Sequence, residues 1–229
     1  MSASPAVAPE PSARIDPPPY RFIYLLVAQL ALILLGPVLG SGRTQPAVAA
    51  AFLLVFLTAL WAVAHERRVR LVALVLAAPA IGLNLIGYAT GSNRAFVTGI
   101  AAALVFLVFI TAVIFRGVVT SQSITRQTIY GAIAAYVLLG MTWALAYGLL
   151  DNLAPGSFRS VEKDGLVMEP NFLFLSFITL TSVGYGDIVP LGEFARSLAI
   201  LEAIAGVMFQ AIFMARLVGL YAPGAGKAT

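Results

Sequence analysis

The sequence predicts an all-α protein that crosses a membrane several times, with a glycine-containing loop between its last two helices. Of its 229 residues, 60% are hydrophobic and only 10% are charged, and the mean hydropathy is +0.94. Soluble domains contain about 45–50% apolar and about 25% charged residues. A second observation is a series of apolar segments, each near the ~20 residues that a helix needs to cross a ~30 Å hydrocarbon layer. These observations indicate a polytopic membrane protein.

The first half of the chain predicts a disordered tail followed by four membrane helices. Residues 1–19 are rich in proline, alanine and serine and cannot bury a core. Four apolar segments follow, at residues 20–39, 46–64, 69–89 and 94–115. Short polar connections separate them, so we expect one four-helix domain over residues 20–116.

Arginine placement predicts the orientation of these helices. The connection after the second segment contains Arg67, Arg68 and Arg70, whereas the connections on the other side contain one arginine each, Arg43 and Arg94. Cytoplasmic loops carry the excess of basic residues. We therefore expect both termini in the cytoplasm.

The second half predicts a further domain over residues 128–222. Residues 117–127 are polar and suggest a short interfacial helix that links the two domains. A fifth span is expected at about residues 128–150, and residues 151–170 are polar and should lie outside the cell. Residues 171–181 are apolar but too short to cross, which is typical of a re-entrant helix. The last span runs over about residues 191–221, and residues 223–229 form a short cytoplasmic tail.

The loop after the re-entrant segment reads Thr-Leu-Thr-Ser-Val-Gly-Tyr-Gly-Asp over residues 179–187. A dehydrated potassium ion is held by rings of backbone carbonyl oxygens in place of its water shell. Turning successive carbonyls toward one axis needs backbone angles that glycine adopts at little cost, which explains Gly184 and Gly186. Ser182 can add a hydroxyl oxygen at the inner end of the row.

This loop resembles the filter of the tetrameric potassium channel superfamily, which reads Thr-Val-Gly-Tyr-Gly-Asp. The resemblance implies an ion-binding set of Thr181, Ser182, Val183, Gly184, Tyr185 and Gly186, with K⁺ at Ser182 to Tyr185. It also implies that Tyr185 braces the loop and that Asp187 supports it at the outer mouth. The chain has a single copy of the motif, so the resemblance implies a homotetramer around a central pore.

The helix order resembles the six-helix channels, whose first four helices form a voltage-sensing domain. The resemblance is specific over about residues 171–221 and only topological over the first 120. In voltage-gated members the fourth helix carries an arginine at every third position. Here that segment has only Arg94 and Arg116, at its two ends. We therefore expect a voltage-sensor-like domain without gating charges, and no steep voltage dependence.

The last span contains the candidate pore-lining residues. Val207, Gln210, Met214 and Val218 recur at intervals of three or four, so they fall on one face of a helix. Gln210 is the expected polar residue of the cavity. Gly206 resembles the family's hinge glycine, although glycine in membrane helices also permits close packing.

Glu202 lies about eleven residues into the last span, roughly 16 Å from its outer end. A carboxyl group at that depth is costly and usually does functional work. We expect it to contact Thr142, Tyr147 or Thr179. It then either braces the loop and affects its opening, or is a protonated side chain that only locks two helices together.

These features favour a potassium-selective channel, with K⁺ as the permeant ion and no other cofactor. Alternatives are a non-selective cation channel, a potassium transporter subunit, or a structural membrane protein with a chance Gly-Tyr-Gly. We expect no enzyme, since the chain has no cysteine and one histidine, His65, and shows no catalytic grouping. The expected partners are identical subunits and lipids, without nucleic acid or a small-molecule substrate. The compact loops and high Ala, Leu and Val content suggest a bacterial plasma membrane.

Overall fold

The computed structural model describes residues 20–39, 45–63, 67–123, 125–160 and 171–221. The predicted tails, residues 1–19 and 223–229, and half of the predicted outer segment, residues 161–170, lie outside the described residues. In order, the elements are α1 (Arg21–Leu39), α2 (Gln45–Val63), α3 (Arg67–Thr90), α4 (Asn93–Thr120), α5 (Arg126–Leu153), β1 (Phe158–Ser160), α6 (Phe172–Leu180), β2 (Ile188–Pro190) and α7 (Glu193–Tyr221).

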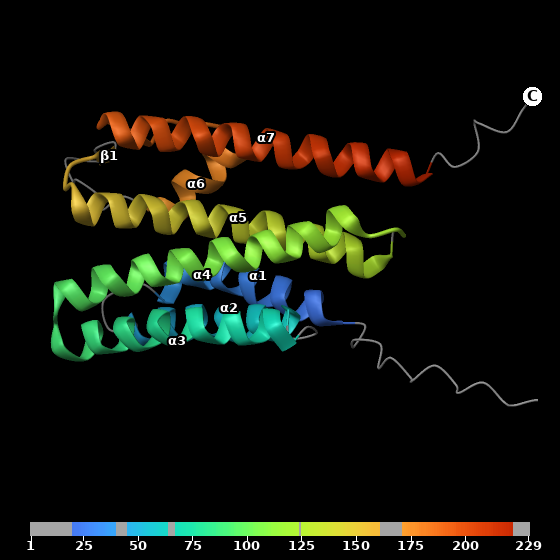
Figure 1. Ribbon diagram of the computed structural model, residues 1–229. Helices are drawn as coiled ribbons and strands as arrows, with labels where there is room; N and C mark the ends of the chain where they lie inside the picture. The colour runs from blue at the N-terminus through green and yellow to red at the C-terminus, as the bar shows by residue number, and fades with distance from the viewer. Residues whose placement is uncertain (1–19, 40–44, 64–66, 124, 161–170, 222–229) are drawn as a thin grey trace, which may run out of the picture.

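The long helices form an elongated bundle, with α5 between α7 and the first four helices (Figure 1). Among the described residues, α3, α4, α5 and α7 are long and apolar enough to cross a membrane. The described apolar parts of α1 and α2 are shorter, at Arg21–Leu35 and Phe52–Val63. The protein is therefore a membrane protein. The prediction was six crossings, and four of the described helices meet the length and hydropathy for one.

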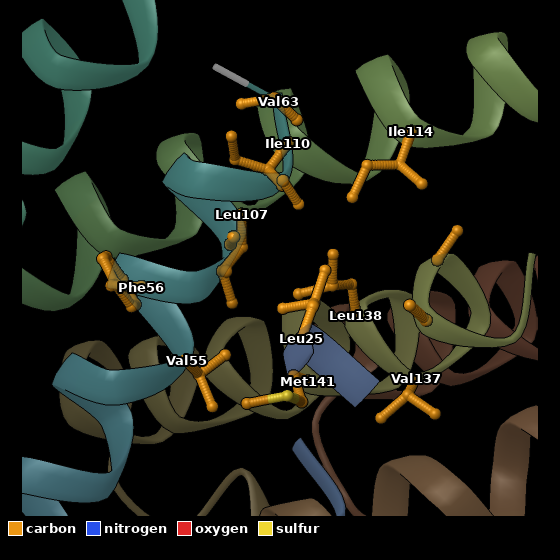
Figure 2. Close-up of a cluster of buried hydrophobic side chains, with 14 of the residues drawn as sticks. Leu25, Val55, Phe56, Val63, Leu107, Ile110, Ile114, Val137, Leu138 and Met141 are labelled. Carbon is orange, nitrogen blue, oxygen red and sulfur yellow. The ribbon is translucent and has the colours of Figure 1, made fainter. Parts of the chain in front are cut away.

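A single hydrophobic core joins the first helices to α5. Side chains from α1, α2, α4 and α5 converge there, among them Leu25, Val55, Leu107, Leu138 and Met141 (Figure 2). The rings of Phe56 and Phe106 stack with centroids 4.5 Å apart. The buried Gln29 amide on α1 donates to the Ala134 carbonyl oxygen on α5 at 3.2 Å. The first helices are thus packed directly against α5.

The separate interfacial helix predicted for residues 117–127 is not formed. Instead, α4 continues to Thr120, because the buried side chain of Val118 extends its apolar face. Residues between the two helices are too few for a third helix, and α5 begins at Arg126. The Thr125 side chain accepts a hydrogen bond from the Thr128 amide in a capping box, which fixes that start.

Two short strands flank the re-entrant helix. β1 pairs with β2 in antiparallel register, with Arg159 opposite Val189, and the Leu191 amide donates to the Ser157 carbonyl at 2.8 Å. The predictions contained no strand here. This pairing joins the segment before α6 to the segment after the glycine-containing loop, so both ends of the loop region are held together.

Candidate functional site

The short helix α6 has defined ends, and the glycine-containing loop follows it directly. The Asn171 side chain caps it by accepting from the Phe174 amide at 3.1 Å. At the other end the Thr181 hydroxyl donates to the Phe177 carbonyl at 2.6 Å. With nine residues, α6 spans only about 14 Å, which is too short to cross a ~30 Å hydrocarbon layer.

The loop after α6 alternates in backbone handedness. Ser182, Gly184 and Gly186 have positive φ angles of 61°, 54° and 82°, and the residues between them do not. In an extended strand successive carbonyls point to opposite sides. Inverting every second residue turns them toward the same side. Ser182 is the one residue other than glycine with positive φ in the described part of the chain, a conformation that is costly for it.

Amide groups at the start of the loop point back to α6. The Val183 and Gly184 amides both donate to the Ile178 carbonyl, at 2.8 and 3.0 Å, and the Ser182 amide donates to the Thr179 carbonyl at 3.0 Å. The N–H and C=O groups of a trans peptide point in opposite directions. The carbonyls of Thr181, Ser182 and Val183 therefore face away from the α6 carbonyls that these amides contact. Residues 181–187 are all exposed in the single chain.

The second half of the loop contacts α6 through a pair of aromatic rings. The Tyr185 ring stacks on that of Phe174 in α6, with centroids 6.2 Å apart and planes 1° from parallel. Asp187 is exposed and immediately precedes β2. Tyr185 thus points from the loop toward the re-entrant helix.

The carboxyl end of α6 is held by residues from α5 and α7. Tyr136 donates its hydroxyl hydrogen to the Leu180 carbonyl at 3.1 Å. Gln210 in turn donates to the Tyr136 hydroxyl at 2.9 Å. The side chain predicted to face a cavity therefore also takes part in positioning the helix end, which the sequence did not indicate.

Gly206 lies against the same carbonyl. A Cβ atom added there would be 2.2 Å from the Leu180 oxygen. α7 is continuous through this position. The structure thus shows a close-packing reason for the glycine, the second of the two interpretations that the sequence allowed.

Glu202 is fully buried where α5, α6 and α7 meet. One carboxyl oxygen, Oε2, accepts from the Tyr147 hydroxyl. The other, Oε1, lies 2.5 Å from Ser176 Oγ, which is itself 2.7 Å from the Gly140 carbonyl oxygen. Glu202 therefore contacts one side chain from each neighbouring helix.

Among the three expected neighbours of Glu202, only Tyr147 bonds to it. The Thr142 hydroxyl instead donates to Leu138 O within its own helix at 2.7 Å, and no hydrogen bond joins Thr179 to Glu202. The prediction missed Ser176. The sequence does narrow the choice, because Ser176 and Thr179 are the two polar residues of α6. Deciding which of them faces Glu202 requires knowing how α6 is rotated about its axis.

The four predicted pore-lining residues lie on an open face of α7. Val207, Met214 and Val218 are each more than half exposed, and Gln210 is also exposed. Arg216, on the opposite face, is half-buried and donates to the Ser121 carbonyl after α4. Within the described residues, the side chains of Val207, Met214 and Val218 on this face are mostly uncovered, whereas Gln210 also donates to Tyr136.

Comparison with known proteins agrees with this geometry. Residues 135–222 match the family described as "Ion channel". Protein LctB of Bacillus caldotenax is 32% identical over 124 residues, which is 52% of this chain and 91% of that protein. Protein LctB of Geobacillus stearothermophilus is 30% identical over 118 residues, or 50% of this chain and 87% of that protein.

A third similar protein is the inward rectifier potassium channel Kirbac3.1 of Paramagnetospirillum magnetotacticum. It is 31% identical over 81 residues, which is 34% of this chain and 24% of that protein. No solved structure gives a significant match. Since the similarity extends over most of the LctB proteins and the family match covers α6, the loop and α7, the chain belongs to the ion channel family.

Proposed function

We propose that the protein is a potassium-selective channel whose filter is formed by residues 182–186. The observation that supports this most directly is the alternation of φ at Ser182, Gly184 and Gly186, which turns the carbonyls of the loop to one side. Rows of carbonyl oxygens replace the hydration shell of K⁺ in potassium channels. The similarity to an inward rectifier potassium channel of Paramagnetospirillum magnetotacticum agrees with this assignment.

A single loop covers only one side of an ion, so the proposal includes a homotetramer. Four copies would place four carbonyl rows around one axis. Two features favour this assembly: residues 181–187 are exposed in the single chain, and α7 has an open apolar face. The proposal also includes six membrane crossings per subunit, cytoplasmic termini and a bacterial plasma membrane location.

The experiment is a reversal potential measured on the purified protein in liposomes. With K⁺ on one side and Na⁺ on the other, a potassium-selective channel should reverse near the K⁺ equilibrium potential. A reversal near zero would contradict selectivity and favour the non-selective cation channel. Native mass spectrometry of the same sample should give the mass of four chains, and a monomer would contradict the assembly.

A further inference from the structure

Three oxygen–oxygen contacts form a chain through the buried junction behind the loop. They join Gly140 O to Ser176 Oγ, Ser176 Oγ to Glu202 Oε1, and Glu202 Oε2 to the Tyr147 hydroxyl. Ser176, Tyr147 and Glu202 each have no exposed surface. Every contact at hydrogen-bond distance between two oxygens needs one hydrogen atom, so the hydrogens of this chain can be counted.

With an ionised Glu202 the count fails. The serine and tyrosine hydroxyls then supply two hydrogens for three contacts, because the Gly140 carbonyl only accepts. If Ser176 donates to Glu202 Oε1, no hydrogen lies between Ser176 Oγ and Gly140 O. If Ser176 donates to Gly140 O instead, no hydrogen lies between Ser176 Oγ and Glu202 Oε1. Either arrangement leaves two buried oxygens at hydrogen-bond distance with no hydrogen between them, which is unfavourable.

With a protonated Glu202 each contact has a hydrogen. Ser176 donates to the Gly140 carbonyl, the Glu202 carboxyl group donates to Ser176 Oγ, and Tyr147 donates to Glu202 Oε2. In the described part of the chain, no cationic side chain pairs with Glu202. A buried carboxylate without a cation is unfavourable, which also favours the neutral form.

We propose that Glu202 is a neutral glutamic acid that donates to Ser176, and that this proton positions α6 and through it the filter. Ser176 is two residues before Ile178, whose carbonyl holds the Val183 and Gly184 amides. The proton therefore links α5 and α7 to the helix from which the loop is suspended. The protonation state stands on the geometry alone, whereas the effect on the filter rests on the proposed function.

The protonation state can be read by infrared difference spectroscopy on the full-length protein. The spectrum of the wild type minus that of Glu202→Gln at neutral pH should contain the carbonyl stretch of a carboxylic acid, with a downshift in D₂O. Carboxylate bands in its place would overturn the assignment. Glu202→Gln is the suitable reference because an amide can also donate to Ser176 and accept from Tyr147, and so preserves the fold.

The positioning role can be read from ion selectivity in liposomes. We expect Glu202→Gln to keep the wild-type reversal potential, and Ser176→Ala to lower the K⁺/Na⁺ permeability ratio at least about tenfold, because it removes the link between all three helices. Thr142→Val is the matched control, since it removes a buried hydroxyl that bonds only within α5. Its selectivity should be unchanged.

The outcomes separate the two proposals. If Ser176→Ala selects K⁺ as well as the wild type does, the positioning role is wrong. If the wild type itself does not select K⁺, the proposed function fails. In that case the infrared bands still decide the protonation of Glu202, and the thermal stability of Ser176→Ala against Thr142→Val still decides whether the link holds the three helices.

Discussion

At the scale of single residues, substituting Gly184, which has a positive φ angle, is the most direct test of the proposed filter. A Cβ atom added there meets nothing within 4 Å in the single chain, so the cost of alanine is in the backbone, where φ is +54°. A left-handed conformation costs an L-residue roughly 1–2 kcal/mol. We expect Gly184→Ala to abolish K⁺ flux or its selectivity, measured by reversal potential in liposomes.

Gly117→Ala provides the control for that substitution. Gly117 also has open space around its Cβ position, but it lies within α4 and has no positive φ. Alanine should be tolerated there. If the Gly184→Ala protein folds and keeps its K⁺ selectivity, the proposal that residues 182–186 form the filter is wrong.

A second prediction concerns Gly206, where the lack of room for a side chain determines the effect of substitution. Gly206→Ala places a methyl group against the Leu180 carbonyl, so α6 and α7 must move apart. Overpacking of this kind costs about 1–3 kcal/mol. We expect a lower midpoint of thermal unfolding for the solubilised protein, together with reduced flux.

Gly219→Ala on the same helix should be silent, because nothing lies within 4 Å of its Cβ position. Comparing Gly206→Ala with Gly219→Ala also distinguishes a packing role of Gly206 from a role as a hinge. A purely hinge role for Gly206 predicts altered opening with an unchanged unfolding midpoint, and that result would contradict the packing explanation.

At the scale of elements, the sequence predicts the helices well and the short connections poorly. Hydrophobic runs of membrane length are strong signals, and the predicted span at residues 20–39 corresponds closely to α1 (Arg21–Leu39). The three-residue strands β1 and β2 are shorter than the alternation needed to recognise a strand. The predicted interfacial helix was wrong because polar residues near Ser121 mark the end of α4 as well as they mark a surface helix.

The contacts behind the loop show the limit of prediction for the site. The motif itself can be read from the sequence, and so can the depth of Glu202, since both depend on local order and helical rise. Its contact with Ser176, and that of Gly206 with Leu180, depend on how α6 is rotated against α7. That rotation is set by packing between segments distant in sequence.

The open face of α7 yields a prediction at this scale. Single cysteines at Val207, Gln210, Met214 and Val218 should be modified by water-soluble thiol reagents applied from the cytoplasmic side, with loss of K⁺ current. The chain has no native cysteine, so the background is clean. The physical reason is that one stripe of the helix faces the proposed aqueous cavity.

Ile212→Cys is the matched control. Ile212 lies about 140° around the helix from Val207 and lines an apolar pocket of about 350 Å³ with Val108 of α4 and Leu139 of α5. Its side chain is 37% exposed in the single chain, but the surrounding side chains are apolar, so a cysteine there should react much more slowly with a charged reagent. Equal reactivity at Ile212 and at the four positions would contradict a pore-facing stripe.

At the scale of the whole molecule, the first four helices contact both α5 and α7, the latter through the rings of Phe115 and Phe209. The core shared with α5 contains side chains from α1, α2, α4 and α5 (Figure 2). At the end where α7 finishes, Arg216 contacts the Ser121 carbonyl. A movement of the first four helices would therefore act on α5 and α7 together. Voltage is one stimulus that acts on charges in membrane helices.

The charges of α4 predict that voltage is not that stimulus. Arg94 and Arg116 lie near its two ends, and the residues between them are uncharged. One charge that crosses 100 mV contributes about 2.3 kcal/mol, and steep gating needs several charges per subunit. Open probability should therefore change only weakly between about −100 and +100 mV in single-channel recordings, and Arg116→Gln should not alter that response. A steep Boltzmann curve with several effective charges that persists in Arg116→Gln would show that another part of the molecule, such as the loop itself, senses the field.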